Sequence, residues 1–321
     1  MALRIGRQGL LGIAIEDTAG TLKAVASNIP FTALTIQGKQ TSQKDIASRG
    51  SRAQNFTSVI GKQWSEGDIT VNVDSLTSGY WLKLATGNEI VNTVQTGVYD
   101  HLFYTTVSGN APLTASLYNY QGVDTSSFAS VVVDKLDLEV KDTLATLKAT
   151  VKGFFPTSST LTQATVSGTL MSFNDYQVQL GSTLIAASTA TKAQITDLSV
   201  TVNNNAEVVY ESGQSTPTRI FWKQLNVIGS FTRFFETPVD RDNYLNLNKQ
   251  SMIVTFSGSA LPGGNVEQIV FNFAKLAYTD AVISTGIETF FAVKTSFEAE
   301  VDPSQGKQYD IVLRNYRSTV Y

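Results

Sequence analysis

The sequence predicts an all-β protein, and three observations carry that prediction. Thr, Val, Ile, Phe and Tyr recur in short runs in which polar and apolar residues alternate, and Gly, Asn, Asp and Ser bound these runs. Such alternation gives a strand one buried and one solvated face. Helical periodicity is confined to two short segments, and strands nowhere alternate with helices as they do in parallel sheets. We therefore expect antiparallel sheets packed as sandwiches or barrels.

Six runs show the alternation most clearly, in both halves of the chain. They are 69–73, 117–120, 136–140, 147–152, 253–256 and 293–297. Each is long enough for one strand of a half-buried sheet.

The first expected helix covers 75–87. Thr77 or Ser78 can cap its start and Gly87 can end it. Its shared apolar face consists of Tyr80, Trp81 and Leu84.

The second expected helix covers 238–247, with Asp240 or Asp242 near its start. Its apolar residues are Tyr244, Leu245 and Leu247. The run 240–243 holds two carboxylates but lacks the central Gly and the distant Glu of a calcium-binding EF-hand loop, so we expect helix capping there.

The two helices lie in matching surroundings, which predicts an internal duplication. The matched segments are 34–37 with 200–203, 62–64 with 223–225, 67–70 with 229–232, and Lys135-Leu136 with Lys275-Leu276. Their spacing shrinks along the chain, which a longer loop in the first half and an insertion of about 21 residues near 88–112 would explain. We expect two tandem antiparallel sandwich- or barrel-like domains, 1–157 and 158–321, each with one short helix and one long hairpin loop.

The most irregular segment is 38–58, a polar stretch with little apolar periodicity. It carries the cations Lys39, Lys44, Arg49 and Arg52. Loops of this length are usually functional or disordered. We expect the four cations to contact acidic groups on a neighbouring copy, with the loop mobile in the free subunit; the alternative is a solvated hairpin tip.

Composition argues against catalysis. The chain has no Cys, which excludes disulfides and thiolate metal sites, and His101 is its one histidine. His101 follows Asp100 in an expected strand, where adjacent side chains point to opposite faces, so no Ser-His-Asp arrangement is indicated. The glycines at 6, 9 and 12 lack the preceding strand and following helix of a dinucleotide site. We predict no catalytic residues, no cofactor and no metal.

The net charge and the fraction of charged residues indicate which kinds of partner the protein can bind. There are 24 basic and 27 acidic residues, a net charge of -3, which argues against a DNA-coating or polybasic membrane-binding protein. Charged residues make up 16% of the chain, below the roughly 25% of average domains, so the surface suits burial against copies of itself. Neither a membrane-spanning run nor a signal-peptide pattern is present, and we expect assembly in a cytoplasm, without secretion.

The chain resembles the tail tube, or major tail, proteins of long-tailed bacteriophages. The stretches that carry the resemblance are 48–57, 67–73, 79–87, 102–104 with 113–118, 129–140, 171–174 and 195–205. The resemblance implies a virion tail protein whose subunits form rings, with β-sheets joined edge to edge around a channel. It implies that the long hairpin loop reaches the adjacent ring. It also implies that the lumen holds a tape-measure protein and passes DNA without specific binding, and that tail terminator and baseplate or tip proteins contact the tube.

Single-domain proteins of this family make six-fold rings, so two tube domains per chain would give a ring of three chains with pseudo-six-fold symmetry. Six chains per ring is the alternative, if the second half is a decoration. Outside this family, a receptor- or carbohydrate-binding β-sandwich module of a phage fibre or secreted adhesin fits the same composition. Contractile and non-contractile tails are not distinguished.

Overall fold

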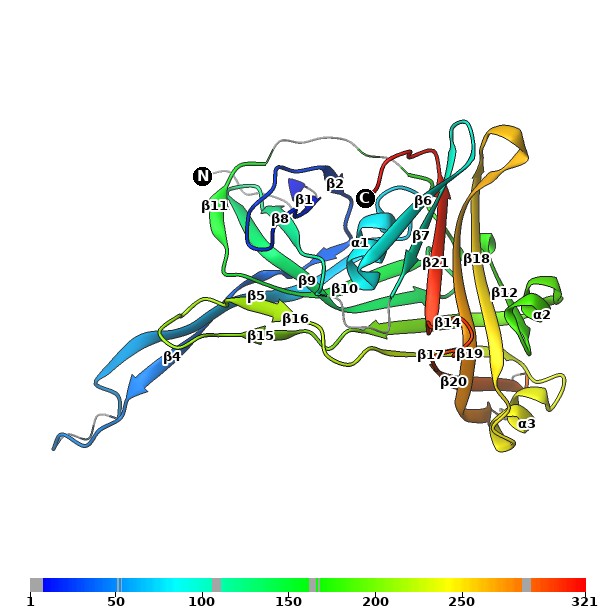
Figure 1. The fold of residues 1–321 in the computed structure, drawn as a ribbon. Coiled ribbons are helices and arrows are strands. Elements are labelled where there is room, and N and C mark those ends of the chain that lie inside the picture. Colours follow the sequence, from blue (N-terminus) through cyan, green and yellow to red (C-terminus); the bar gives the residue numbers. More distant parts are fainter. Residues whose placement is uncertain are drawn as a thin grey trace.

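The computed structural model describes residues 8–50, 52, 54–105, 111–161, 166, 168–284 and 290–321. It is mostly strand with antiparallel pairing throughout, which confirms the all-β prediction. One long central sheet runs through the molecule, and two outer sheets pack against parts of it (Figure 1).

The central sheet consists of two groups of strands. The first group has the order β3/β4–β5–β10–β9 and the second has the order β14–β17–β20–β19. The first group's strands are β3 (Ala33–Leu34), β4 (Gln37–Asp45), β5 (Thr57–Asn72), β9 (Thr125–Val140) and β10 (Thr146–Gly153). The second group's strands are β14 (Ile195–Asn203), β17 (Asn226–Phe234), β19 (Val266–Ser284) and β20 (Ala292–Ala299). Strand β9 pairs with β14 and joins the groups into one sheet.

Long strands β9 and β19 continue from the central sheet into the outer sheets. The first outer sheet has the order β2–β1–β8–β9–β11, and the second has the order β13–β12–β18–β19–β21–β7–β6. The strands not yet given are β1 (Leu10–Ile15), β2 (Ser27–Ile29), β6 (Asn88–Gln95), β7 (Val98–Tyr104), β8 (Ala115–Tyr120), β11 (Thr157–Ser159), β12 (Tyr176–Gly181), β13 (Lys192–Ala193), β18 (Gln250–Ala260) and β21 (Tyr309–Asn315). Strands β15 (Glu207–Val209) and β16 (Arg219–Phe221) form a separate hairpin.

Both expected helices are present, as α1 (Ser78–Thr86) and α3 (Val239–Leu245). Gly87 ends α1 in the left-handed conformation, as predicted. The start of α1 differs from the prediction: Thr77 occupies the cap position but its side chain does not cap the helix, and the Asp74 carboxylate accepts the backbone N–H groups of Leu76 and Thr77, just before the helix, at 2.8 and 2.6 Å. A third helix, α2 (Leu184–Thr189), was not predicted. Two 3₁₀ turns lie at Phe173–Asp175 and Pro262–Gly264.

The prediction that 240–243 caps the second helix was wrong. Asp240 is 2% exposed and forms an ion pair with Arg233 on β17, and no side chain caps α3. Burial raises the pKa of Asp240, although Arg233 opposes the rise. This carboxylate therefore ties α3 to the central sheet.

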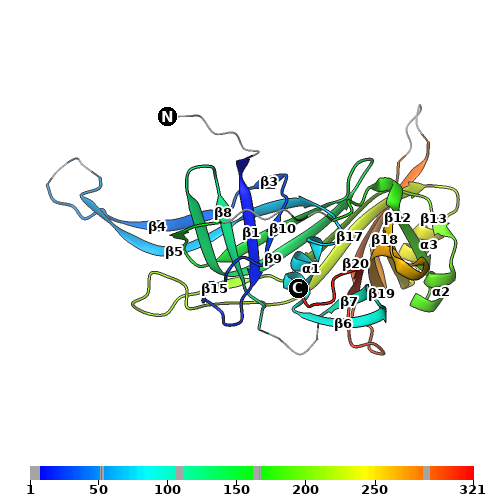
Figure 2. The ribbon, with the colours of Figure 1, turned by 90° about the horizontal axis from the view of Figure 1, so that it is seen from above.

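The expected irregular loop at 38–58 is mainly a two-stranded ribbon. Strands β4 and β5 pair from Gln37↔Glu66 to Asp45↔Thr57, so that only its tip is irregular. The ribbon projects far beyond the body of the protein, on the side away from β12, β18 and α3 (Figures 1 and 2). Most of its residues are exposed on both faces, so no alternation of buried and exposed residues marked them as strands.

The two groups of the central sheet share register as well as strand order. Ile69 on β5 lies opposite Leu34 and Ala149, and Phe231 on β17 lies opposite Leu198 and Thr295. Each group also has a bulge where its third strand meets its fourth, at Asp134 on β9 and at Thr279 on β19.

This register agrees with the sequence match of 67–70 with 229–232 and disagrees with the other three. The register places Trp64 in the position of Asn226 rather than Leu225. It places Leu34 in the position of Leu198 rather than Val200, and Leu136 in the position of Ala281 rather than Leu276. The β6–β7 hairpin falls where the insertion was expected, since α3 leads directly into β18. The duplication itself stays a prediction.

One apolar core runs through both halves. Its largest fully buried side chains are Trp81, Tyr80, Tyr309, Phe103, Phe128, Phe231, Phe256, Phe273 and Phe297. Helix α1 contributes Tyr80 and Trp81 on the face that packs against β9 and β7.

Candidate assembly surfaces

The central sheet has an open edge at each end. In the described residues, β3 and β4 pair with β5 alone, and the last part of β19, 277–284, pairs with β20 alone. Thr279, Asp280, Val282 and Ser284 are exposed, and Val282 is 55% exposed. An unpaired edge presents backbone donors and acceptors that can extend a sheet with another chain. These two edges are therefore candidate contacts between copies.

The junction between the groups shows how such edges fit together. Strand β9 pairs with β14 from Lys135↔Asn203 to Val140↔Leu198. On one face the junction buries apolar side chains from both strands, namely Leu136, Leu138, Val140, Leu198, Val200 and Val202. On the other face the Thr201 hydroxyl donates to the Asp137 carboxylate at 2.5 Å.

The four predicted contact cations are spread along the ribbon rather than gathered. Lys39 lies near its base opposite Trp64, Lys44 lies farther out opposite Ser58, and Arg49 and Arg52 lie in the tip. Arg49 forms an ion pair with Asp45 of the same ribbon, and its guanidinium lies 5.1 Å from the centre of the Phe56 ring. Arg49 is therefore engaged within its own chain.

Sequence reasoning missed the apolar residues of the ribbon, which are exposed. They are Ile46 at 69%, Phe56 at 39%, Val59 at 58% and Ile60 at 64% exposed. Apolar side chains held on a projecting ribbon indicate an interaction surface. The signal was present in the sequence as four large apolar residues within a polar segment.

The second hairpin, β15–β16, lies beside the ribbon (Figure 1). The Gln63 N–H donates to the Ser215 carbonyl at 2.7 Å, and the Lys62 ammonium lies 4.7 Å from the centre of the Tyr210 ring. The long hairpin of each half therefore projects in the same direction.

One face of the central sheet is polar, and several of its charges are paired. Lys148 lies 2.9 Å from Asp68, and Lys135 lies 2.9 Å from Asp137. Partial burial opposes ionisation of Asp68, but hydrogen bonds from Lys148 and Thr150 outweigh it and lower the pKa of Asp68. The face thus alternates in sign over short distances rather than forming a basic track.

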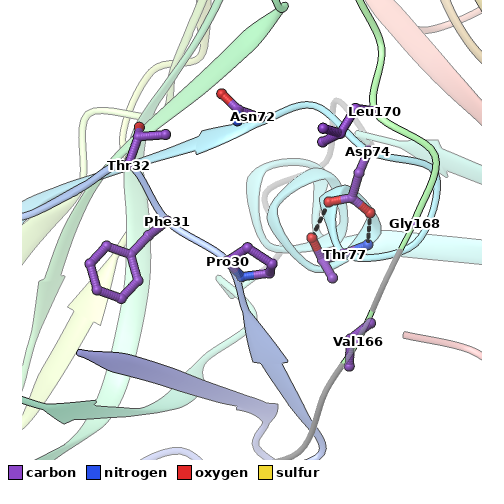
Figure 3. Close-up of a pocket in the computed structure, with 9 residues that line it drawn as sticks. All are labelled: Pro30, Phe31, Thr32, Asn72, Asp74, Thr77, Val166, Gly168 and Leu170. Atoms are coloured by element: carbon purple, nitrogen blue, oxygen red, sulfur yellow. Dashed lines mark hydrogen bonds between the residues drawn. The ribbon is translucent and has the colours of Figure 1, made fainter. Parts of the chain in front are cut away.

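A hollow of about 270 Å³ lies beside the start of α1 (Figure 3). Its lining residues are Pro30, Phe31, Thr32, Asn72, Asp74, Thr77, Val166, Gly168 and Leu170. Asp74 is the charged group among them, and both its oxygens accept hydrogen bonds from Leu76 and Thr77, in the turn just before α1. The carboxylate is therefore used to begin the helix, and the hollow has no arrangement for acid–base chemistry.

His101 is fully buried and holds the chain end in place. Its Nδ1 lies 2.7 Å from Glu89 Oε1, and its Nε2 lies 2.9 Å from the Arg317 carbonyl oxygen. The Tyr321 ring packs against the imidazole at 5.0 Å, and the Tyr321 N–H donates to Glu89 at 2.9 Å. Both ring nitrogens have partners, so His101 has a structural role.

We expect Glu89→Gln to destabilise the protein by about 3 kcal/mol, because Lys83, 3.0 Å from Glu89, would lose its carboxylate in a buried site. Burial opposes ionisation of Glu89, but hydrogen bonds from His101 and Lys83 outweigh it and lower its pKa below the ordinary 4.5. Its stabilisation is therefore complete above pH 4.5 and is lost as the pH falls through the lowered pKa.

Urea unfolding between pH 3 and pH 7 measures this effect. The variant should lose part of the wild-type pH dependence along with its stability. The control is Glu207→Gln, since the Glu207 side chain is 46% exposed and pairs with Lys223 at the surface. Equal stability losses in the two variants would show that the Glu89 network does not act as described.

Among the described residues, no group of His, Cys, Asp and Glu is arranged to hold a metal ion. None of the helices in the described ranges is long and apolar enough to span a membrane. The open edges and the projecting hairpins are features of the class of structural proteins that associate with copies of themselves.

Comparison with known families agrees with that class. The family model described as phage tail tube protein matches residues 6–305. The chain therefore belongs to the phage tail tube protein family, which is a family of structural virion tail components and not of enzymes. A search of curated proteins found no match. The resemblance identified from the sequence is confirmed.

Proposed function

We propose that this protein builds the tail tube from rings of three chains, in which each chain supplies two equivalent tube domains, 1–157 and 158–321. The observation that supports this proposal is the shared strand order, register and bulge of the two central groups. One tube unit then begins at β1 and the next at β12. The internal β9–β14 junction would act as one of six similar junctions around the ring.

The size of the closed sheet favours three chains over six. Each chain contributes eight strand positions to the central sheet, four from each group, so three chains contribute 24. At about 4.8 Å between strands and a tilt of about 40°, the barrel backbone would be roughly 48 Å across. Six chains would double this to roughly 96 Å, far wider than a DNA duplex with its surrounding water.

The β6–β7 hairpin would stabilise the pair of domains within one chain. It belongs to the first domain by sequence, yet β7 pairs with β21 of the second. The Arg314 guanidinium binds both Asp100 carboxylate oxygens, at 2.7 and 2.9 Å. A paired, bidentate contact of this kind fixes orientation as well as position.

The polar face of the central sheet is the surface that we assign to the lumen. It would hold the tape-measure protein during assembly and conduct the genome during ejection. Because Lys135, Lys148 and Lys152 on this face are paired with carboxylates, they offer little net charge for phosphate binding, and DNA would pass without specific binding.

The outer part of the β4–β5 ribbon would contact the adjacent ring, through Lys44, Arg49 and Arg52 as well as its exposed apolar residues, whereas Lys39 lies at the base of the ribbon. At the ends of the tube the same surfaces would meet the tail terminator and the baseplate or tip proteins. Assembly would take place in the host cytoplasm.

Electron microscopy of the purified protein across a concentration series tests this function. A tube subunit should form hollow tubes above a critical concentration. A receptor- or carbohydrate-binding module of a fibre or adhesin would remain as discrete particles, and that outcome would reject the proposal.

A further inference from the structure

We propose that the open edge of β19 pairs antiparallel with the open edge of β3–β4 in the next chain, in a defined register. In this register Ile283 lies opposite Ile36, Val282 opposite Gln37 and Asp280 opposite Lys39. The inference rests on the proposed ring and adds to it the identity of the contacting residues.

The internal junction provides the template. In β9–β14, Leu138 lies opposite Val200, Asp137 opposite Thr201 and Lys135 opposite Asn203. If the two groups are equivalent units, the junction between chains repeats these pairings with the corresponding residues.

The residue that corresponds to Val200 follows from the strand partners. Leu34 corresponds to Leu198, because each lies opposite an equivalent residue, Ile69 or Phe231. Gln37 lies opposite Glu66, three residues before Ile69, and Thr201 lies opposite Ile228, three residues before Phe231. Gln37 therefore corresponds to Thr201. Ile36 therefore occupies the position of Val200.

Lys39 is placed in the same way. It lies opposite Trp64, and Asn203 lies opposite Asn226, each five residues before Ile69 or Phe231. Lys39 therefore occupies the position of Asn203.

The correspondence on the other edge passes through the bulges. Lys135 lies opposite Thr150 and Asp280 lies opposite Ser296, and both follow their bulge directly. Thr150 and Ser296 are equivalent because they lie opposite Asp68 and Ser230. Asp280 therefore occupies the position of Lys135, and Ile283 that of Leu138.

The resulting contacts, which follow from strand pairing alone, are chemically complementary. Lys39 and Asp280 have opposite charge and would lie directly opposite each other on the polar face. Within the described residues neither forms an ion pair with its own chain. On the apolar face Ile36 would meet Ile283. A slip of one residue would put Ile36 opposite Val282 and invert one strand's faces relative to the other.

Engineered disulfides test the register, because the natural chain has no Cys. Tubes of Gln37→Cys, Val282→Cys should oxidise to covalently linked chains, up to a three-chain species on a denaturing gel. The matched control is Gln37→Cys, Asp280→Cys. These two side chains lie on the same face of the sheet, but Asp280 is two residues away from Val282, so it is a diagonal neighbour of Gln37 and not directly opposite it. Disulfides need Cβ atoms about 3.5–4.5 Å apart, whereas diagonal neighbours are about 7–8 Å apart. The control should therefore stay largely monomeric on the gel.

A charge exchange gives a second readout without thiols. Lys39→Glu should raise the critical concentration for tube formation by roughly two- to fivefold, the effect of one unfavourable cross-strand pair, and adding Asp280→Lys should restore it. Lys44→Glu, farther along the same ribbon, should not be rescued by Asp280→Lys.

The outcomes separate the register from the proposed function. Tubes that cross-link through the control pair, or that show no rescue by charge exchange, would overturn the register and leave the tube function standing. Wild-type protein that forms no tubes at all would overturn both.

Discussion

Replacing residues 41–60 with a short Gly-Ser turn should give a folded, soluble protein that forms rings and no long tubes. The outer part of the β4–β5 ribbon lies away from the core and its side chains are mostly exposed, so its removal should cost little stability. The base of the ribbon, with Gln37 and Lys39, is kept because it belongs to the proposed contact within the ring. Mass measurement in solution and negative-stain images distinguish rings from tubes, and long tubes of this variant would rule out the ribbon as the stacking element.

Two point-mutant sets separate the contributions of charge and apolar area to stacking. Burying one large apolar side chain is worth about 1.5–3 kcal/mol, whereas an exposed ion pair is worth about 0–1 kcal/mol. We therefore expect Ile46→Ser, Phe56→Ser, Ile60→Ser to shorten or abolish tubes. The set Lys44→Ser, Arg49→Ser, Arg52→Ser should weaken stacking less, and mainly at low salt. The reverse order would show that the cations predicted from the sequence carry the contact.

The second large effect is expected from Gly67→Val and Gly229→Val, at equivalent positions of β5 and β17. A Cβ on Gly67 would lie 2.4 Å from the Ile36 backbone, and a Cβ on Gly229 would lie 2.5 Å from the Ser199 carbonyl oxygen. A backbone cannot yield as a flexible side chain can, so each substitution should cost about 3 kcal/mol or more and reduce soluble yield.

Chemical unfolding of the two variants measures this cost. The control is Thr70→Val, on the polar face of the same strand, which should stay within about 1 kcal/mol of the wild type. Wild-type stability in Gly67→Val would mean that β3 and β5 are not as close as described.

The features that the sequence predicted are those with local causes. Alternation marked β5, β9, β10 and β20, because each has one face in the core. Gly67 and Gly229, which the sequence match paired, hold the same place in their strand groups, and close backbone approach leaves both positions without room for a side chain. Helices α1 and α3 were predicted from their apolar faces, whereas α2 was not predicted.

The features that the sequence did not predict depend on groups that lie outside the helix or strand concerned. The α1 cap was assigned to Thr77 or Ser78, but neither side chain caps the helix, and Asp74 instead accepts the N–H groups of Leu76 and Thr77 in the turn before it. Asp240 resembled a capping residue, but it is recruited by Arg233 on a neighbouring strand. The ribbon was hidden because both its faces are solvated. The open edges of β4 and β19 were not predicted, because a strand edge is open only when no other strand pairs with it. That depends on the arrangement of the whole sheet.

A reconstruction of the assembled tube tests the central claim most directly. The account predicts three chains per ring and pseudo-six-fold symmetry of the inner wall, with β19 of one chain continuous with β3–β4 of the next. Six chains per ring would contradict it, and the equivalence of the two halves as tube domains would fall with the trimer.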